Sequence, residues 1–326
     1  MFWSRYRQNK GVNLINQVEP NYGEEEINNL VDYLNSGGWI TEHTVTKSFN
    51  EKIKDFVNRE YSLSVPSGTT AIYLALLAIG IGPGKKVAVP NITMIASLNS
   101  ILWAGGEPVL VDVDEEMCMS LDKLKTIENL SAVIYVPLNG RTENGKEIED
   151  WCKNNNIKLI EDSAHALGSK YQSGEFCGSL GDISIFSFTP HKIITMGQGG
   201  MVLTNNEQIY EFLYDLKTFN REKDKMDVHK GFGLNFKITD IQASLGLAQF
   251  KKLNQFINKK NDIFRSYSEN VDSKFFGLKT FKKFEVPWFI DIELKDNNLI
   301  NKLHTYLMEN DIETRFAYPP LSSQNF

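Results

Sequence analysis

The sequence predicts an α/β protein whose core is a mainly parallel β-sheet. Its apolar segments are short, as buried strands are, and helical segments such as 145–156 separate several of them. Apolar strands that alternate with helices are typical of a parallel sheet. The segments that we expect as strands are 87–90, 107–114, 132–140, 183–188, 201–205 and the first part of 157–168, which ends in Glu161 and Asp162.

Three helices are predicted in the N-terminal part. Residues 24–35 show an amphipathic pattern that two glycines end, and residues 44–58 show a second one. A third helix is apolar; it begins in the segment SGTTA at 67–71 and is closed by the glycines within 80–84.

The amino-acid composition of the chain changes near residue 245. Residues 245–271 read as one long helix rich in lysine and asparagine, and short strands (285–294) and another helix (297–312) follow. We therefore divide the chain into an N-terminal segment with a large domain, 1–245, and a small α+β domain, 246–326.

The composition excludes several classes of function. The chain has 326 residues, enough for two domains of unequal size, and its net charge of -6 argues against a broad surface for nucleic acid or membrane. The three cysteines have no metal-ligand spacing, so no metal site is expected, and scattered thiols are typical of a reducing, cytoplasmic setting. The N-terminal stretch 1–11 is too polar and short for a signal peptide, and no apolar run reaches about 18 residues.

One lysine, Lys192, lies in an otherwise apolar or small run, FSFTPHKIITMGQGG at 186–200. Burial among apolar groups lowers the pKa of a lysine and leaves a neutral, nucleophilic amine, which Schiff-base chemistry requires. The alternative is a surface lysine whose stem covers its apolar neighbours.

The segment SGTTA has the features of a phosphate site. Free N–H groups at a helix N-terminus, together with the positive end of the helix dipole, favour an anion, and Gly68 lets the backbone approach closely. Ser187, five residues before Lys192, offers a further hydroxyl. An ordinary Ser or Thr N-cap is the alternative.

Asp162 ends a predicted parallel strand, which is where open α/β sheets bind their ligands. A buried carboxylate there requires a cationic partner, such as a protonated pyridine nitrogen. His165, three residues later, is placed to contact the same ligand. The alternatives are an aspartate that caps the next helix and a histidine with a structural role. Taken together, the lysine, the aspartate and the phosphate site describe one cofactor, pyridoxal phosphate.

Five segments resemble the DegT/DnrJ/StrS family of sugar aminotransferases in their order and in their residue patterns. They are 67–84, 87–114, 160–171, 181–205 and 231–253. The likeness runs from about residue 15 to the end of the chain. It implies the fold-type I architecture, with a large α/β domain built on a seven-stranded sheet and a small C-terminal domain. It also implies a homodimer with active sites at the interface.

The resemblance carries over to particular residues. Lys192, five residues before the GQGG turn, matches the family's Schiff-base lysine, and Asp162 matches the partner of the pyridine nitrogen. His165 matches a Gln or His position beside the ring hydroxyl. The positions that match phosphate contacts are Gly68, Thr69, Ser187 and Asn235, the last reaching the phosphate from the other subunit.

Other positions concern the substrate. Thr41 falls in a stretch that usually lines the sugar pocket, and Lys237 stands at the shared site where arginine is common. A substrate diphosphate requires cations, and the candidates are Lys237, Arg221 and Arg315; ordinary exposed cations are the alternative for all three.

The chain also departs from the family pattern. Met94 stands where an aromatic ring usually stacks on the cofactor, and a methionine packs there with weaker stacking. Ser322 replaces a common histidine, and PLNGRT at 137–142 replaces a more usual HLYG stretch. Typical members continue for several dozen residues beyond the end of this chain, so we expect a reduced or truncated small domain.

The resemblance implies a ping-pong transfer of an amino group from an amino acid, glutamate, to a nucleotide-linked 4-keto-6-deoxyhexose. This is the perosamine type of reaction, and O-antigen or other surface polysaccharide synthesis is its usual setting. One alternative is a 3-keto-sugar aminotransferase, and another is a non-catalytic family member. A third is a sugar dehydratase with histidine at the lysine position, but counting back from GQGG places Lys192 there and not His191.

Overall fold

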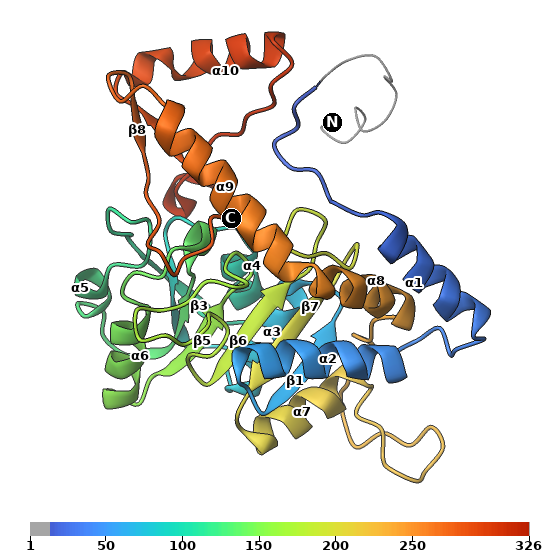
Figure 1. Ribbon diagram of the computed structural model, residues 1–326. Helices are drawn as coiled ribbons and strands as arrows, with labels where there is room; N and C mark the ends of the chain where they lie inside the picture. Colours follow the sequence, from blue (N-terminus) through green and yellow to red (C-terminus); the bar gives the residue numbers. More distant parts are fainter. Residues whose placement is uncertain (1–13, 326) are drawn as a thin grey trace.

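A seven-stranded sheet forms the centre of the computed structural model, which describes residues 14–325 (Figure 1). Its strand order is β1-β7-β6-β5-β4-β2-β3, and β7 alone runs antiparallel to its neighbours. The strands are β1 (Tyr61–Val65), β2 (Lys86–Pro90), β3 (Glu107–Val111), β4 (Leu130–Tyr135), β5 (Lys158–Asp162), β6 (Ile183–Ser187) and β7 (Gly200–Thr204). The predicted α/β class with a mainly parallel sheet is confirmed. The N-terminal stretch 1–11, whose polarity argues against a signal peptide, lies outside the described residues.

Strand β1 was missing from the sequence prediction. Two serines, Ser62 and Ser64, interrupt its apolar pattern, yet both are buried. Their hydroxyls are satisfied by Asn50 of the neighbouring helix, because Ser62 Oγ donates to the Asn50 carbonyl at 3.1 Å and Ser64 Oγ donates to the Asn50 side chain. A buried hydroxyl is tolerated when it has a hydrogen-bond partner, and only the tertiary structure supplies this one.

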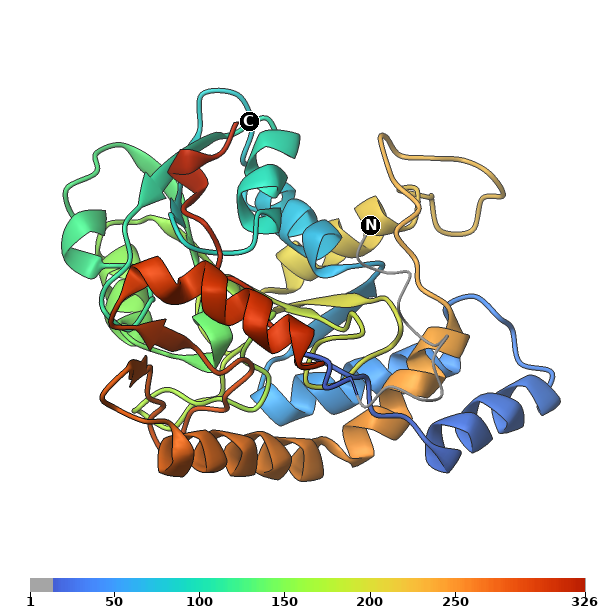
Figure 2. The same cartoon turned by 90° about the horizontal axis from the view of Figure 1, so that it is seen from above.

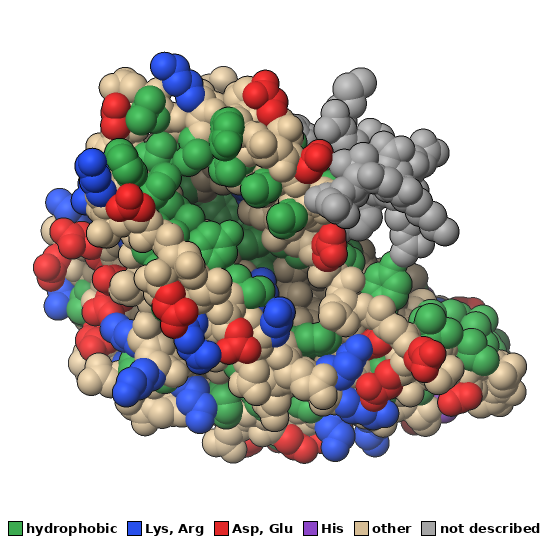
Figure 3. Space-filling view, turned by 45° about the horizontal axis from the view of Figure 1, so that its top comes forward, with side chains coloured by type: hydrophobic (Ala, Val, Ile, Leu, Met, Phe, Trp, Pro, Cys, Tyr) green, Lys and Arg blue, Asp and Glu red, His purple; other side chains and the backbone are tan. Residues whose placement is uncertain are grey.

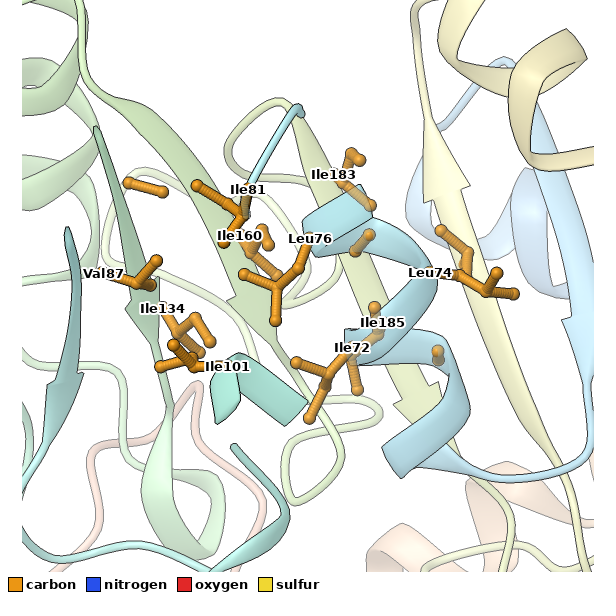
Figure 4. Packing of buried hydrophobic residues seen from close by; sticks show 14 of the residues in the cluster. Ile72, Leu74, Leu76, Ile81, Val87, Ile101, Ile134, Ile160, Ile183 and Ile185 are labelled. Carbon is orange, nitrogen blue, oxygen red and sulfur yellow. The ribbon is translucent and has the colours of Figure 1, made fainter. Parts of the chain in front are cut away.

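Helices cover both faces of the sheet, and the alternation of side chains along the strands fills two separate layers. Ile183 and Ile185 of β6 point to the layer that also contains α3, whereas Phe186 packs on the opposite face. Figure 4 shows Ile72 and Leu76 of α3 among side chains from the strands. The helices of this part are α1 (Glu24–Asn35), α2 (Thr44–Val57), α3 (Gly68–Ala78), α4 (Ala96–Trp103), α5 (Leu121–Leu124), α6 (Gly145–Asn154) and α7 (Glu207–Lys217).

The long helix predicted at 245–271 is wrong as a single element. The chain forms α8 (Asp240–Lys251) and α9 (Leu253–Asn270), which meet at Lys252. Lys252 and Gln249 both bind Glu26 of α1, and Gln249 Nε2 donates to Glu26 Oε1 at 2.8 Å. Packing against α1 thus fixes α8, while the break allows α9 to turn away along the outside of the molecule (Figure 1). The predicted domain boundary at 245 lies inside α8.

Figure 1 shows the C-terminal part above the large sheet, and in Figure 2, which is seen from above, it lies in front of the sheet. It contains a two-stranded sheet of β8 (Phe276–Leu278) and β9 (Ile292–Leu294), and the helix α10 (Ile300–Glu309). The face seen in Figure 3 is hollowed beneath this part, and hydrophobic side chains border the recess. The strands predicted across 285–294 are mostly wrong, because residues 285–291 form hydrogen bonds to the large domain instead; for example, Trp288 N donates to the Asn139 carbonyl at 3.0 Å.

Two features are absent from residues 14–325, the part of the chain that the structure describes. No helix in this range is long and apolar enough to cross a membrane. No cluster of three or more His, Cys, Asp or Glu side chains in the same range could hold a metal ion.

Candidate active site

Lys192 lies in the loop that joins β6 to β7. The loop is closed at its base by a hydrogen bond from Phe188 N to the Gly199 carbonyl at 2.8 Å. The Lys192 ammonium lies 4.0 Å from the centre of the Trp288 ring. Burial lowers the pKa of Lys192 to about 7; the nearby Asp162 carboxylate opposes this shift and the positive charge of Arg315 adds to it. A large fraction of Lys192 is therefore a neutral amine near pH 7.

Asp162 is the last residue of β5 and is 5% exposed. Its carboxylate accepts a hydrogen bond from Ser97 Oγ at 2.8 Å and one from Ala164 N at 3.3 Å. Burial raises the pKa of Asp162. The residues after it form turns and no helix, so this aspartate is not a helix cap. A buried carboxylate at the end of a parallel strand, with two neutral donors, is suited to a cationic ligand group.

His165 lies beside Asp162 and is packed between two aromatic rings. Its ring centre is 4.0 Å from that of Trp288 and 6.1 Å from that of Tyr318. Burial lowers the pKa of His165 well below its usual value, so the imidazole is neutral. Its Nδ1 is buried without a hydrogen-bond partner in the described protein, which leaves that nitrogen available for a ligand.

The N-terminus of α3 lies against the end of β6. Ser67 caps the helix, since its Oγ accepts a hydrogen bond from Thr70 N at 3.2 Å. The first N–H groups of a helix have no partner within the helix, and here they include those of Gly68 and Thr69. A Cβ added at Gly68 would lie 2.9 Å from Ser187 Cβ, so the two elements approach too closely for a larger residue. The Ser67 N-cap and the phosphate site that the sequence predicts therefore fall on the same turn.

Two further predicted residues lie near this group. Met94 precedes α4, is 43% exposed, and its carbonyl accepts a hydrogen bond from the N–H of Ser97, the residue that binds Asp162. Arg315 follows α10, and its guanidinium lies 4.7 Å from the centre of the Tyr318 ring. Of the residues that the sequence nominated for cofactor contacts, Lys192 and His165 share the neighbour Trp288, and Asp162 and Met94 share the neighbour Ser97, whereas Asn235 lies elsewhere.

Four predicted residues form a second, separate group. Thr41 pairs with Thr239 in an isolated bridge, and Asn235 pairs with Thr218. The charged ends of Lys237 and Arg221 each lie 5.6 Å from the centre of the Phe219 ring. All four are exposed, on or beside the chain between α7 and α8, part of which projects from the body of the molecule (Figure 1).

The sequence reasoning missed three residues of the site. Ser97 gave no signal because a serine inside an apolar helix has no distinctive pattern, and its partner Asp162 is 65 residues away. Trp288 and Tyr318 lie in the C-terminal part, and Trp288 falls in the segment 285–294, where the predicted strands were mostly wrong. Trp288 Nε1 donates to the His191 carbonyl at 2.7 Å, which fixes its ring over the lysine loop.

Pyridoxal phosphate fits this arrangement. Asp162 offers a buried carboxylate for a protonated ring nitrogen, and His165 offers an unpartnered Nδ1 for the ring hydroxyl. The close approach of Gly68 to Ser187 at the start of α3 offers a cradle for the phosphate. Lys192 supplies the amine, and these residues lie at or after the ends of β5 and β6 or at the start of α3, at one edge of the sheet.

Known proteins are similar to this chain over most of its length. The DegT/DnrJ/EryC1/StrS aminotransferase family matches residues 20–326. A GDP-perosamine synthase of Escherichia coli O157:H7 is 34% identical over 303 residues, which are 91% of this chain and 82% of that protein. A GDP-perosamine synthase of Vibrio cholerae is 31% identical over 316 residues, 94% of this chain and 85% of that protein. The PLP-form structure of a putative sugar aminotransferase from Streptococcus pneumoniae has a TM-score of 0.87 at 26% identity and covers 95% of this chain and 86% of its own.

Proposed function

The chain belongs to the DegT/DnrJ/EryC1/StrS aminotransferase family, as its motifs predicted, and we propose that it aminates C4 of a 4-keto-6-deoxyhexose carried on GDP, with glutamate as donor. The two relatives named GDP-perosamine synthase support this substrate class, since each aligns with more than nine tenths of the chain. The observation that carries the proposal is the buried Lys192 near the Asp162 carboxylate, with a pKa that burial lowers to about 7.

Pyridoxal phosphate supplies an aldehyde that takes up the amino group and a ring that withdraws electrons from the substrate carbon. Lys192, whose pKa of about 7 leaves a large neutral fraction near pH 7, takes the proton from the donor's α carbon at Nζ and delivers it to the cofactor. Trp288 covers the lysine on one side and keeps water from that face. The amine thus works as a base in a site where its charge is disfavoured by burial.

The remaining residues of the site bind and orient. Asp162, held by Ser97, keeps a proton on the ring nitrogen, because a buried carboxylate favours a cation beside it. The N–H groups of Gly68 and Thr69 and the hydroxyl of Ser187 would bind the phosphate. His165 would hydrogen-bond the ring hydroxyl through its unpartnered Nδ1, and Met94 would pack on the face of the ring.

A second copy of this chain completes the site in our proposal. Asn235, Lys237 and Thr41 are exposed, and large hydrophobic residues are exposed on the same part of the chain: Trp39 is 71% and Phe232 is 72% exposed. Exposed aromatic side chains of this size favour a protein interface. In a symmetric dimer Asn235 reaches the phosphate of the partner's site, and the cationic Lys237 and Arg221 face the substrate's diphosphate.

The test is an absorbance spectrum of the protein loaded with pyridoxal phosphate, recorded before and after glutamate is added. We expect a band of lysine-bound cofactor that glutamate converts to the amino form, and then a 4-amino sugar from GDP-4-keto-6-deoxymannose. The Lys192→Ala variant is the control and should give neither change. A protein that binds the cofactor but releases ammonia and forms no amino sugar is a dehydratase. One that gives no band at all is not an aminotransferase.

A further inference from the structure

A cleft adjoins the candidate active site on the side of the C-terminal part. Its volume is about 110 Å³, and the large domain contributes Asn139 while the C-terminal part contributes Asp291, Arg315 and Tyr318. The centre of the Tyr318 ring lies 6.1 Å from that of His165, and the positive charge of Arg315 contributes to the lowered pKa of Lys192. Lys192 does not line the cleft, but Tyr318 and Arg315 connect the cleft to the candidate active site.

Asp291 is the cleft's fixed hydrogen-bond acceptor. Its carboxylate accepts hydrogen bonds from Asn139 Nδ2 at 3.0 and 2.9 Å and from Arg141 Nη1 at 2.7 Å. Asn139 and Arg141 are 3% and 1% exposed, whereas the Asp291 side chain keeps 20% of its surface open. Asn139 and Arg141 thus bind the Asp291 carboxylate from its buried side, and the lone pairs on its exposed side stay available for a ligand.

The backbone of the large domain is shaped to hold this contact. Asn139 adopts a left-handed conformation with φ of 55°, and Gly140 follows with φ of 96°. A Cβ at Gly140 would lie 2.0 Å from the Val286 carbonyl oxygen, so the turn needs glycine. The amide oxygen of Asn139 is buried without a hydrogen-bond partner in the described protein, which reduces the stability of the fold at this position.

The chemistry of the cleft fits a hydroxylated ring. Phe289 and Tyr318 offer aromatic surface for the apolar faces of such a ring, and Asp291 accepts from hydroxyl groups. Arg315 lies over both aromatic rings and is available for an anionic group attached to the ligand. The hexose of a nucleotide sugar matches all of these features.

We propose that Asp291 determines sugar specificity by accepting hydrogen bonds from hydroxyl groups of the hexose, whose ring occupies this cleft. The inference rests on the proposed function and deepens it. The local turn at Asn139 and Gly140, which belongs to the departure from the family pattern at 137–142, positions the carboxylate for this purpose.

The test compares two ligands on the cofactor-loaded protein by titration calorimetry: GDP-mannose, which carries the hydroxyl groups, and GDP, which lacks the sugar. In the Asp291→Asn variant we expect the affinity for GDP-mannose to fall roughly tenfold to a hundredfold, as for the loss of a hydrogen bond to a charged group. The affinity for GDP should stay within about twofold, and so should the rate at which glutamate converts the cofactor.

Glu285→Gln is the matched control. Glu285 lies in the same segment and binds Thr142 of the same loop at 2.8 Å, but it does not line the cleft. This variant should bind both ligands as the wild type does, and thermal unfolding of both variants reports any general loss of structure.

Three results would overturn the inference: unchanged binding of GDP-mannose in Asp291→Asn, an equal loss of GDP binding, or a slower reaction with glutamate while the sugar ligand still binds normally. A wild type that binds neither GDP ligand contradicts instead the proposed function itself.

Discussion

The chemistry of Lys192 depends on two opposing effects at one residue. Burial beneath Trp288 disfavours the charged ammonium, and the Asp162 carboxylate favours it; burial is the larger effect, so the pKa falls to about 7 from an ordinary value of 10.5. Between these two pH values the unfolded chain binds a proton at Lys192 that the folded chain lacks. The free energy of unfolding of the cofactor-free protein therefore rises with pH across this window.

Lys192→Met tests this effect directly. Because the methionine cannot titrate, the variant should lose a contribution of up to about 1.4 kcal/mol per pH unit from the slope of unfolding free energy against pH. Urea unfolding of cofactor-free wild type and variant between pH 7.5 and 9.5 measures both slopes. Parallel slopes would show that Lys192 keeps its ordinary pKa in the folded protein.

At the scale of elements, the connection that follows β5 is fixed by a buried carboxylate next to Asp162. Glu161 is fully buried and accepts hydrogen bonds from Tyr171 Oη and Ser163 Oγ at 2.7 Å and from the N–H groups of Gly178 and Leu180 at 2.8 Å. Successive residues of a strand point to opposite faces, so Glu161 anchors this connection from the face opposite Asp162. The position of the site residue thus depends on a neighbour that never touches the ligand.

Glu161→Gln should lower the free energy of unfolding by about 2 to 4 kcal/mol. The reason is that the amide NH₂ cannot accept hydrogen bonds, so buried donors lose their partner. Urea unfolding at pH 7 measures the loss. Glu60→Gln serves as the control, because that side chain is exposed and should change stability by less than about 0.5 kcal/mol. A loss as small as that of the control would mean that the Glu161 hydrogen bonds are dispensable.

At the scale of the whole molecule, the single chain divides its predicted site residues between two places. Lys192 and Asp162 lie at one edge of the sheet, whereas Asn235 and Lys237 lie on an exposed segment with other contacts. A two-fold symmetric dimer joins such separated surfaces, because it brings residue i of one subunit to residue j of the other. The proposed shared site is a consequence of this division.

Mixing two inactive variants tests the shared site. Lys192→Ala removes the amine of one site, and Asn235→Ala removes the phosphate contact given to the partner. After subunit exchange, random pairing makes about half of the dimers mixed, and each mixed dimer has one intact site, so about a quarter of wild-type activity should return. No recovery, despite exchange shown by differently tagged subunits, would mean that each chain builds its own complete site.

Much of the fold could be predicted because local sequence patterns specify its strands and helices. The strands β2, β4, β5, β6 and β7 are short apolar runs, and α1, α2 and α3 have clear periodicity and end signals. Lys192 and Asp162 could be nominated for the same reason, since a lysine in an apolar run and an aspartate at a strand end are both visible in a few residues of sequence. These features depend only on neighbours along the chain.

The tertiary structure alone decided the rest. It paired Ser97 with Asp162 across 65 residues and Asn139 with Asp291 across 152. It also allowed β1 to be buried, because Asn50 of α2 accepts hydrogen bonds from the β1 serines. Packing of α8 against α1 ended the predicted long helix at Lys252. Each of these outcomes is a hydrogen bond or contact between distant segments. The sequence determined which residues could do chemistry; the folded chain determined which of them meet, because desolvation and hydrogen-bond satisfaction are properties of the packed molecule and not of a local stretch.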